Sequence, residues 1–295
     1  MPEWQGKSKG SALGYRIFVF VCRKLGVRPA YVLLRFVSFY YFLFSWTTSG
    51  YIYAYFRHRL GYRSLPSFFK IYTNYYKLGQ TLIDKMMVMA GIGGSFTYDF
   101  DGEQNLRDIV AGGRGGILLS AHVGNWEAAG HLLKRLDARI NVVMYDGEHQ
   151  AIKQYMEQVT GGRNFNVIVI RDNMSHVYEM GDALEKNELI CMHADRFLPG
   201  NKTVVRDFLG APAHFPEGPF ALAAAFRVPV SFVFAFKENA EHYHFFGSQP
   251  HERDSEENKG EFRDRLASAF VAEVAQKVRL YPVQWFNYYN FWRTY

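Results

Sequence analysis

The sequence has few of the residues that stabilise small secreted proteins or bind structural metals. Its 295 residues include only two cysteines, Cys22 and Cys191. A disulfide framework needs more cysteines than this, and a closed zinc site normally takes four ligands with tight local spacing. Hydrophobic residues make up 48% and charged residues 21%, which excludes a disordered chain. We therefore expect a folded protein with reduced thiols, in a reducing compartment, and no metal site.

Acidic residues are almost absent from the first 80 positions. Twelve basic residues stand there against Glu3 alone, a net charge of +11, while the rest of the chain carries −5. The same 80 residues hold 22 of the 51 aromatic residues. Cationic side chains beside Trp and Tyr suit an anionic lipid interface. We therefore expect residues 1–95 to form a membrane-associating helical region. A buried helical hairpin with a solvated basic face is the alternative.

No apolar run in this part reaches the length of a regular transmembrane helix. A bilayer core requires roughly 20 consecutive apolar residues, and the run between Arg35 and Ser45 is much shorter. An in-plane or shallowly inserted helix is the expectation, and a tilted span from Tyr31 to Thr48 is the alternative. The late start of the run and the lack of a small-residue cleavage site argue against a cleaved signal peptide.

From about residue 110, short apolar runs alternate with amphipathic stretches. This alternation predicts crossover connections and a mostly parallel sheet flanked by helices, an α/β domain over residues 96–295. The predicted strands are Ile117–Ala121, Ile140–Tyr145, Val167–Ile170, Leu189–His193 and Val230–Phe236. The predicted helices are Trp126–Leu136, Glu148–Val159, Ser175–Lys186, Pro219–Arg227 and Glu261–Leu280.

His122 directly follows the first of these strands, and Glu127 falls in the first turn of the next helix. A carboxylate on one imidazole nitrogen fixes the tautomer, so that the other nitrogen can take a proton from a hydroxyl or amine. We expect Glu127 to accept the hydrogen on Nδ1. Gly124 lets the backbone turn sharply and is expected to direct N–H groups at a developing oxyanion. A histidine that merely ends the strand is the structural alternative.

The segment His122-Val-Gly-Asn-Trp-Glu127 resembles the His-x4-Asp/Glu block of the lysophospholipid acyltransferase superfamily, in the form found in its lipid A late (lauroyl/myristoyl-type) acyltransferase branch. Further segments resemble that family in the same order along the chain. They are Gly161–Arg163, His193–Arg196, Phe208–Pro212, Gly218-Pro219, Val228–Val230 and Tyr281–Trp285. The resemblance covers about residues 10–290.

Two segments depart from the lipid A branch. Phe215–Gly218 is more similar to the Pro-Glu-Gly block of glycerophospholipid acyltransferases, and Asp195 is followed by Arg196 where the branch more often has Gln or His. Both departures leave the acceptor open between a lipid A-like precursor or other envelope lipid, a lysophospholipid and an aminolipid.

The resemblance implies transfer of a fatty acyl chain from an acyl thioester, on acyl carrier protein or coenzyme A, to a lipid hydroxyl or amine. His122 and Glu127 are the implied general-base dyad. The implied substrate-binding residues are Arg163, Asp195, Arg196, Glu217 and Gly218. No cofactor is implied besides the thioester co-substrate. The implied location is the cytoplasmic face of a bacterial inner membrane, with peripheral attachment or a single N-terminal anchor.

Other interpretations remain open at this point. Basic charge interleaved with aromatic residues is also found in single-stranded nucleic-acid-binding proteins, although here the aromatics stand in continuous apolar runs. A lipid hydrolase would use His122 and Glu127 to activate water. The glycine-rich segment 111–116 lacks the Gly-Lys-Ser/Thr of a phosphate loop, and Ser120 lacks the Gly-x-Ser-x-Gly setting of serine hydrolases. His242 and His244 share a strand face without an apparent third metal ligand.

Overall fold

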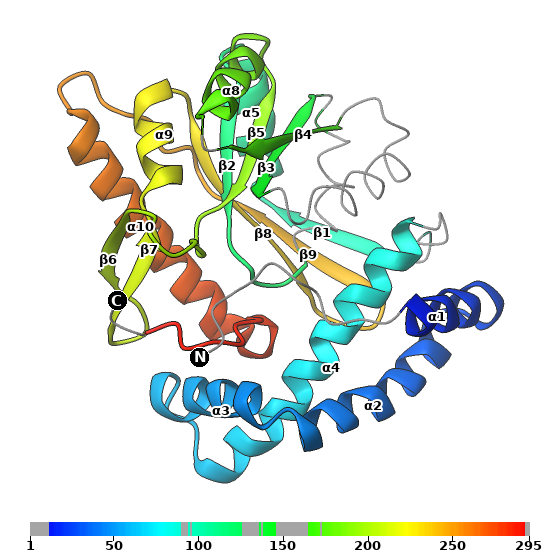
Figure 1. The fold of residues 1–295 in the computed structure, drawn as a ribbon. Helices are drawn as coiled ribbons and strands as arrows, with labels where there is room; N and C mark the ends of the chain where they lie inside the picture. The colour runs from blue at the N-terminus through cyan, green and yellow to red at the C-terminus, as the bar shows by residue number, and fades with distance from the viewer. Residues whose placement is uncertain are drawn as a thin grey trace.

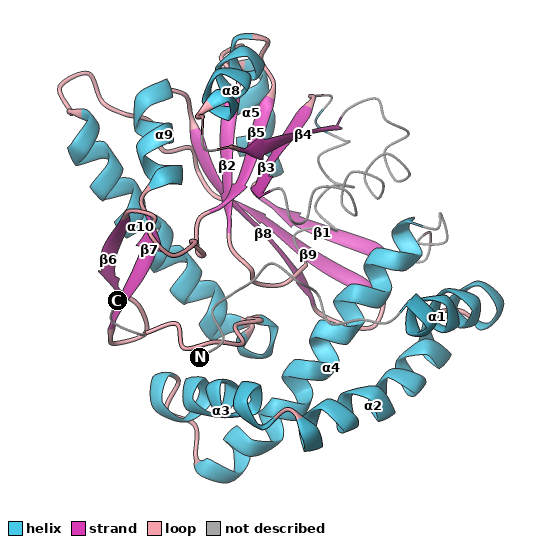
Figure 2. Ribbon diagram, viewed as in Figure 1, coloured by secondary structure: helices cyan, strands magenta, loops and turns pink. Residues whose placement is uncertain are grey.

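The computed structural model describes residues 12–89, 94, 96–125, 136, 138–145, 165–171 and 173–292. Figures 1 and 2 show a central sheet, helices on both of its faces, and a separate group of helices at one end. That group contains α1 (Ala12–Leu25), α2 (Val27–Phe44), α3 (Trp46–Ala54), the π-helix η1 (Tyr55–Arg59) and α4 (Ser64–Met89).

The sheet has seven strands in the order β1-β9-β8-β2-β5-β3-β4. All neighbouring pairs are parallel except β8 and β9. The strands are β1 (Thr97–Asp101), β2 (Gly116–Ser120), β3 (Ile140–Tyr145), β4 (Phe165–Ile170), β5 (Leu189–His193), β8 (Val230–Lys237) and β9 (His242–Gly247). β6 (Thr203–Asp207) and β7 (Pro212–Pro216) form a separate antiparallel pair. The prediction of a mostly parallel α/β fold is confirmed.

The centre of the sheet is apolar on both sides because helices cover both faces. Every residue of β2 is buried. Ile117 and Leu119 belong to one hydrophobic cluster with α8 (Ser175–Glu185), α9 (Gly218–Phe226) and α10 (Lys259–Leu280). Leu118 points to the other face, where it belongs to a cluster with α5 (Glu103–Ala111). The short 3-10 helix η3 (Pro282–Gln284) follows α10.

All five predicted strands exist, and the structure adds β1, α5, β6 and β7, which the sequence did not reveal. β1 alternates exposed and half-buried residues at the sheet edge, with Asp99 and Asp101 on its exposed positions. Such an edge strand lacks the continuous apolar run that identified the central strands. The predicted helices Trp126–Leu136 and Glu148–Val159 lie outside the described residues, apart from Leu136.

The helical group packs against the body through two hydrophobic clusters. α1, α2 and the C-terminal half of α4 pack with β8 and β9. α3, η1 and the N-terminal half of α4 join the main cluster of the body. Within the group, α2 and α4 approach so closely that a Cβ added at Gly79 would lie 2.3 Å from Leu34 Cδ1. The proposed division at residue 95 remains a prediction.

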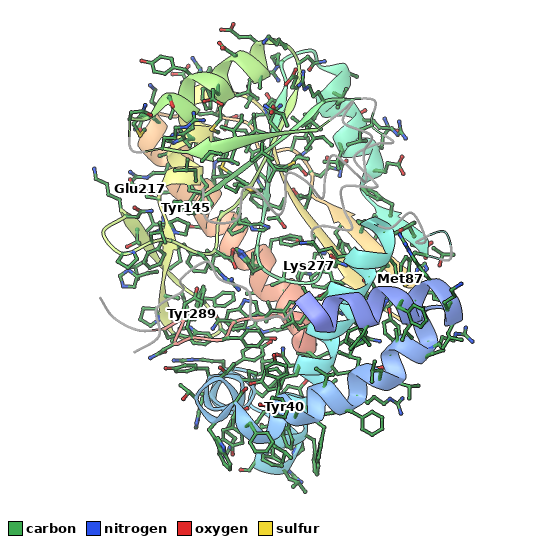
Figure 3. All side chains as sticks on the ribbon, turned by 45° about the vertical axis from the view of Figure 1, so that its right-hand side comes forward. Tyr40, Met87, Tyr145, Glu217, Lys277 and Tyr289 are labelled. Carbon is green, nitrogen blue, oxygen red and sulfur yellow. The ribbon has the colours of Figure 1, made fainter. Side chains whose placement is uncertain are left out.

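α2 is the one helix among the described residues that is long and apolar enough to cross a membrane, by length and composition. Core helices of soluble proteins and signal sequences meet the same criterion, but only 28% of α2 is buried. Its buried residues, from Val27 to Ser38, follow one helical face. The opposite face carries exposed apolar side chains, and Figure 3 shows Tyr40 there, remote from the sheet.

Candidate active site

The candidate site lies where two adjacent parallel strands end. β2 and β5 pair in a register that sets Ser120 opposite His193. His122 and Asp195 each follow two residues later, so the register places them side by side at the same sheet edge. The amide of Ala194 donates to the carbonyl of Ser120 at 2.9 Å and continues the pairing beyond the strands. The carboxyl ends of parallel strands are where α/β proteins collect reactive groups.

Asp195 holds His122 with both carboxylate oxygens. Oδ1 lies 2.8 Å from the imidazole Nδ1, and Oδ2 accepts the backbone N–H of His122 at 2.9 Å. Burial of Asp195 opposes its ionisation, but the charge and hydrogen bond of His122 and the charge of Arg196 outweigh it and lower the pKa of Asp195 below its ordinary value. An ionised carboxylate only accepts hydrogen bonds, so Nδ1 carries the hydrogen and Nε2 of the neutral ring is the basic nitrogen.

The Nδ1 hydrogen, which the sequence analysis assigned to Glu127, therefore points at Asp195. Asp195 had been expected among the substrate-binding residues, where it was to order neighbouring arginines. The parallel register of β2 and β5 places Asp195 beside His122. Residue spacing within one segment cannot reveal this register. Glu127 and Arg163 both lie outside the described residues, so a catalytic role of Glu127 and a substrate-binding role of Arg163 stay predictions.

A second imidazole lies beside the first. The ring centroids of His193 and His122 are 4.2 Å apart. Burial, together with the charges of His122 and Arg196, lowers the pKa of His193 well below its ordinary value, although Asp195 opposes the shift. His193 is therefore neutral at physiological pH, and a neutral neighbour adds no charge repulsion when His122 takes up a proton.

The loop after β2 is fixed by backbone hydrogen bonds to β8 and to the C-terminal segment. Gly124 donates to the carbonyl of Gln284 at 2.8 Å, and Asn125 donates to that of Ala235 at 2.7 Å. Gly124 has a φ of +63°, and a Cβ there would lie 1.9 Å from the Ala235 oxygen. Only glycine fits this turn. The expectation that this turn directs N–H groups at an oxyanion does not hold for Gly124 and Asn125, because both amides are donated to carbonyls.

The remaining predicted substrate-binding residues are Arg196, which directly follows Asp195, and Glu217 and Gly218 at the start of α9. Arg196 donates to the carbonyl of Phe286 at 2.9 Å, and its guanidinium lies 5.9 Å from the ring centre of Tyr289. Glu217 precedes α9 and pairs with Arg263 of α10 at 2.6 Å. A Cβ added at Gly218 would meet open space. Acceptor binding by Arg196, Glu217 and Gly218 stays a prediction.

The described residues contain no group of three or more His, Cys, Asp or Glu side chains that could hold a metal ion. His242 and His244 instead contact carboxylates along the sheet edge. His242 Nε2 lies 3.4 Å from Asp99, and His244 Nε2 lies 3.1 Å from Asp101. These contacts are those of a polar strand rim.

Comparison with known proteins identifies the family. The model of the bacterial lipid A biosynthesis acyltransferase family matches residues 72–294. The chain belongs to this family. The match contains both His122 and Asp195, and it begins within α4, so most of the aromatic helical group precedes it.

Two relatives are phosphatidylinositol mannoside acyltransferases from strains H37Rv and CDC 1551 of Mycobacterium tuberculosis. Each is 28% identical over 123 residues, which is 41% of this chain and 39% of the relative. A solved structure, the 1-acyl-sn-glycerophosphate (LPA) acyltransferase PlsC from Thermotoga maritima, is similar with a TM-score of 0.42 and 10% identity, over 90% of this chain and 95% of that one.

Sequence reasoning missed the imidazole–carboxylate pair of this family member and the neighbouring His193. The equal spacing is visible once the strand ends are known, because His122 and Asp195 each lie two residues beyond the end of β2 and β5. Had the two strands been taken as neighbours, the pair would have followed. The sheet order, which places β5 between β2 and β3, was the missing information.

Proposed function

We propose that this protein transfers a fatty acyl chain from an acyl thioester to a hydroxyl or amine of a lipid acceptor, with His122 as general base. The observation that carries the proposal is the 2.8 Å contact between His122 Nδ1 and Asp195 at the ends of β2 and β5. Family membership supports the reaction class. The mycobacterial relatives, which are named phosphatidylinositol mannoside acyltransferases, support a lipid acceptor.

The proposed reaction proceeds by direct attack. Nε2 of His122 takes the proton of the acceptor hydroxyl, whose oxygen attacks the thioester carbonyl carbon. The tetrahedral intermediate collapses with cleavage of the carbon–sulfur bond, and the imidazolium returns its proton to the leaving thiolate. Asp195 keeps the ring in the required tautomer and stabilises the imidazolium. The products are an acylated lipid and a free thiol, and no acyl-enzyme forms.

We further propose that the exposed face of the helical group seats the enzyme on an anionic membrane. Phe36, Phe39 and Tyr40 on α2 and Trp46 on α3 are exposed apolar residues. Exposed basic residues flank them, with Arg35 on the same helix. Aromatic rings at headgroup depth with cations on lipid phosphates are the usual chemistry of such a surface. An in-plane seat at the cytoplasmic face of a bacterial inner membrane agrees with this arrangement.

The test is product analysis by mass spectrometry. Purified protein in detergent is given lauroyl-coenzyme A or lauroyl-acyl carrier protein together with a lipid A precursor, a lysophospholipid or an aminolipid. We expect an acylated lipid and free thiol. Release of free fatty acid alone would indicate a hydrolase. Tight, salt-sensitive oligonucleotide binding without turnover would support the nucleic-acid alternative.

Three substitutions test the proposed catalytic residues. His122→Ala is expected to abolish transfer while the protein stays folded and membrane-bound, and Asp195→Asn is expected to lower kcat strongly because the amide can present an N–H to Nδ1 and impose the wrong tautomer. Glu127→Gln is expected to lower turnover with little loss of donor binding. Wild-type turnover by His122→Ala would refute the mechanism.

Lipid analysis of a deletion strain would identify the acceptor and the length of the transferred acyl chain.

A further inference from the structure

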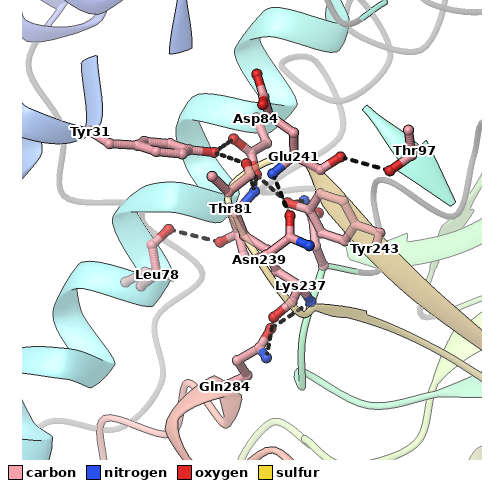
Figure 4. A network of polar contacts seen from close by, with 12 residues as sticks. Tyr31, Leu78, Thr81, Asp84, Thr97, Lys237, Asn239, Glu241, Tyr243 and Gln284 are labelled. Carbon is pink, nitrogen blue, oxygen red and sulfur yellow. Dashed lines mark hydrogen bonds and ion pairs between the residues drawn. The ribbon is translucent and has the colours of Figure 1, made fainter. Parts of the chain in front are cut away.

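A buried polar network joins the helical group to the body. The carboxylate of Asp84 on α4 lies 2.6 Å from Lys237 Nζ on β8 and accepts hydrogen bonds from the hydroxyls of Tyr31 on α2 and Tyr243 on β9. All four residues are buried. Figure 4 shows the carboxylate of Asp84 between these three partners, and the four residues come from four different elements.

The network extends into the loop that carries His122. The side-chain amide of Asn125 donates to the hydroxyl oxygen of Tyr243 at 3.0 Å. Tyr243 in turn donates its single hydrogen to Asp84. Burial, followed by the charge of Asp84, raises the pKa of Tyr243 well above its ordinary value, so the hydroxyl keeps that hydrogen. Asn125, Tyr243 and Asp84 thus form one directed chain of hydrogen bonds.

A second connection reaches the same loop from the same lysine. The Gln284 side chain bonds both backbone groups of Lys237, each at 2.9 Å. The carbonyl of Gln284 accepts the amide of Gly124. The loop from His122 to Asn125 is therefore held at its last two residues by groups that converge on Lys237 and Asp84.

Hydrophobic packing alone would not require these polar groups. A buried ion pair is seldom more stabilising than apolar side chains of the same volume, because both charges lose their hydration. Its directional hydrogen bonds, however, admit one geometry. Reaction geometry is sensitive to displacements of about 1 Å, so a loop that presents a general base benefits from such support.

We propose that Tyr243, oriented by Asp84, is a positioning residue of the acyl transfer: its hydroxyl fixes Asn125 and with it the loop that presents His122. This inference rests on the proposed role of His122. Tyr243 acts through Asn125, and Tyr31 lies on the other side of the carboxylate, with its hydroxyl directed at Asp84 and the Ala240 carbonyl.

The structure supplies a matched pair of variants for the test. Tyr243→Phe and Tyr31→Phe each remove one buried hydroxyl from the same carboxylate and keep the ring, but only Tyr243→Phe breaks the link to Asn125. With lauroyl-coenzyme A as donor, we expect Tyr243→Phe to lower kcat about tenfold to a hundredfold at little-changed KM. We expect Tyr31→Phe to stay within about twofold of the wild type, because its hydroxyl contacts Asp84 and the Ala240 carbonyl and not the loop whose displacement would disturb the reaction geometry. Equal kcat values for the two variants would overturn the proposal.

Two further measurements separate positioning from general loss of stability. Asn125→Ala should lower kcat as Tyr243→Phe does, and the double variant should be no worse than either single one, since both remove the same link. Hydrogen exchange at the backbone amide of Asn125 should be faster in Tyr243→Phe than in the wild type. Any increase in Tyr31→Phe should be smaller. Identical exchange in both would refute the link without reference to activity, whereas an active His122→Ala would refute the proposed function and leave the link between Tyr243 and Asn125 standing.

Discussion

The two regions of this protein use the same aromatic side chains in opposite ways. In the α/β body, Phe220, Phe232 and Phe270 are at most 2% exposed and pack ring against ring. On α2, Phe36 is 72% exposed, and on α3 Trp46 is 81% exposed. Both regions bury aromatic rings, such as Phe56 on η1, but α2 and α3 also leave large aromatic rings exposed.

The difference teaches that α2 carries apolar residues beyond those its packing uses. One face, with Ala30, Tyr31 and Leu34, is buried against the rest of the protein. The opposite face contributes little to folding stability, since its side chains are not buried within the protein. A contiguous exposed apolar patch of this kind marks an interaction surface. The body is thus built for stability, and the helical group is built for stability on one side and for contact on the other.

The largest effect is expected where the two regions join. Lys237→Met leaves the Asp84 carboxylate buried without its cation, and we expect the free energy of unfolding to fall by about 3–5 kcal/mol. Burial raises the pKa of Asp84 and lowers that of Lys237, and their mutual attraction opposes both shifts. Chemical denaturation followed by circular dichroism would measure the loss.

The control for this junction removes both charges. Asp84→Asn combined with Lys237→Met keeps an oxygen acceptor for the tyrosine hydroxyls, and we expect it to recover a large part of the lost stability. If the double variant is as unstable as Lys237→Met, the cost comes from packing around the methionine and the ion pair does not account for it.

The next comparison sets one phenylalanine of each region against the other. Phe270→Ala removes a buried ring that contacts Phe220 and Phe232, and we expect a loss of about 3–5 kcal/mol in the free energy of unfolding. Phe36→Ala removes an exposed ring, and its stability should stay within about 0.5 kcal/mol of the wild type. Comparable losses would show that the exposed face of α2 is covered in the folded protein.

Membrane binding should depend on the exposed rings of α2 and not on Phe270, which is the reverse of the order expected for stability. Replacing Phe36, Phe39 and Tyr40 together by serine should lower partitioning to anionic vesicles at least about tenfold, since burial of even one such ring in an apolar environment contributes about 1.5–3 kcal/mol. Sedimentation with phosphatidylglycerol-containing vesicles measures this. Phe270→Ala, assayed where it is folded, is the control and should partition like the wild type. Unchanged partitioning of the triple variant would remove these residues from the proposed membrane seat.

The sequence was sufficient for the elements whose environment is apolar on all sides. β3 and β5 were predicted with their observed bounds, because continuous apolar runs identify central strands of parallel sheets. The basic and aromatic character of the first 80 residues also pointed to a distinct helical region, and α1 to α4 occupy it. Where the local sequence pattern determines the secondary structure, the pattern was enough to predict it.

The parts that failed depend on contacts between distant segments. Asp195 reaches His122 only because β5 inserts beside β2, and local spacing cannot reveal a sheet order. The Gly124 amide was expected to be available, but a carbonyl 160 residues later in the chain accepts it. Asp84, Lys237 and Tyr243 showed no local pattern at all, since each comes from a different element. Long-range pairing decided the polar chemistry, whereas local patterning decided the scaffold.

The smallest expected effect is a dependence of folding stability on pH that differs between the two regions. Burial lowers the pKa of His193 in the folded body, whereas the unfolded chain takes up a proton near the ordinary value of about 6.5. Below that pH the unfolded state binds more protons, so stability must fall as the pH falls. We expect the wild type to lose stability relative to His193→Gln from about pH 6.5 downwards, with a slope of at most about 1.4 kcal/mol per pH unit.

Urea denaturation at several pH values between about 7.5 and 5 gives the difference curve, since the ordinary histidine pKa of about 6.5 lies inside that range. His58→Gln is the matched control in the helical group, because that imidazole is exposed on η1 and exposed substitutions change stability little. A sloping curve for His193→Gln and a flat one for His58→Gln would locate the histidine contribution to acid sensitivity in the body, beside the reactive imidazole. Parallel curves for the wild type and His193→Gln would mean that His193 accepts a proton as readily in the folded protein as in the unfolded chain. The case for a neutral imidazole beside His122 would then be lost.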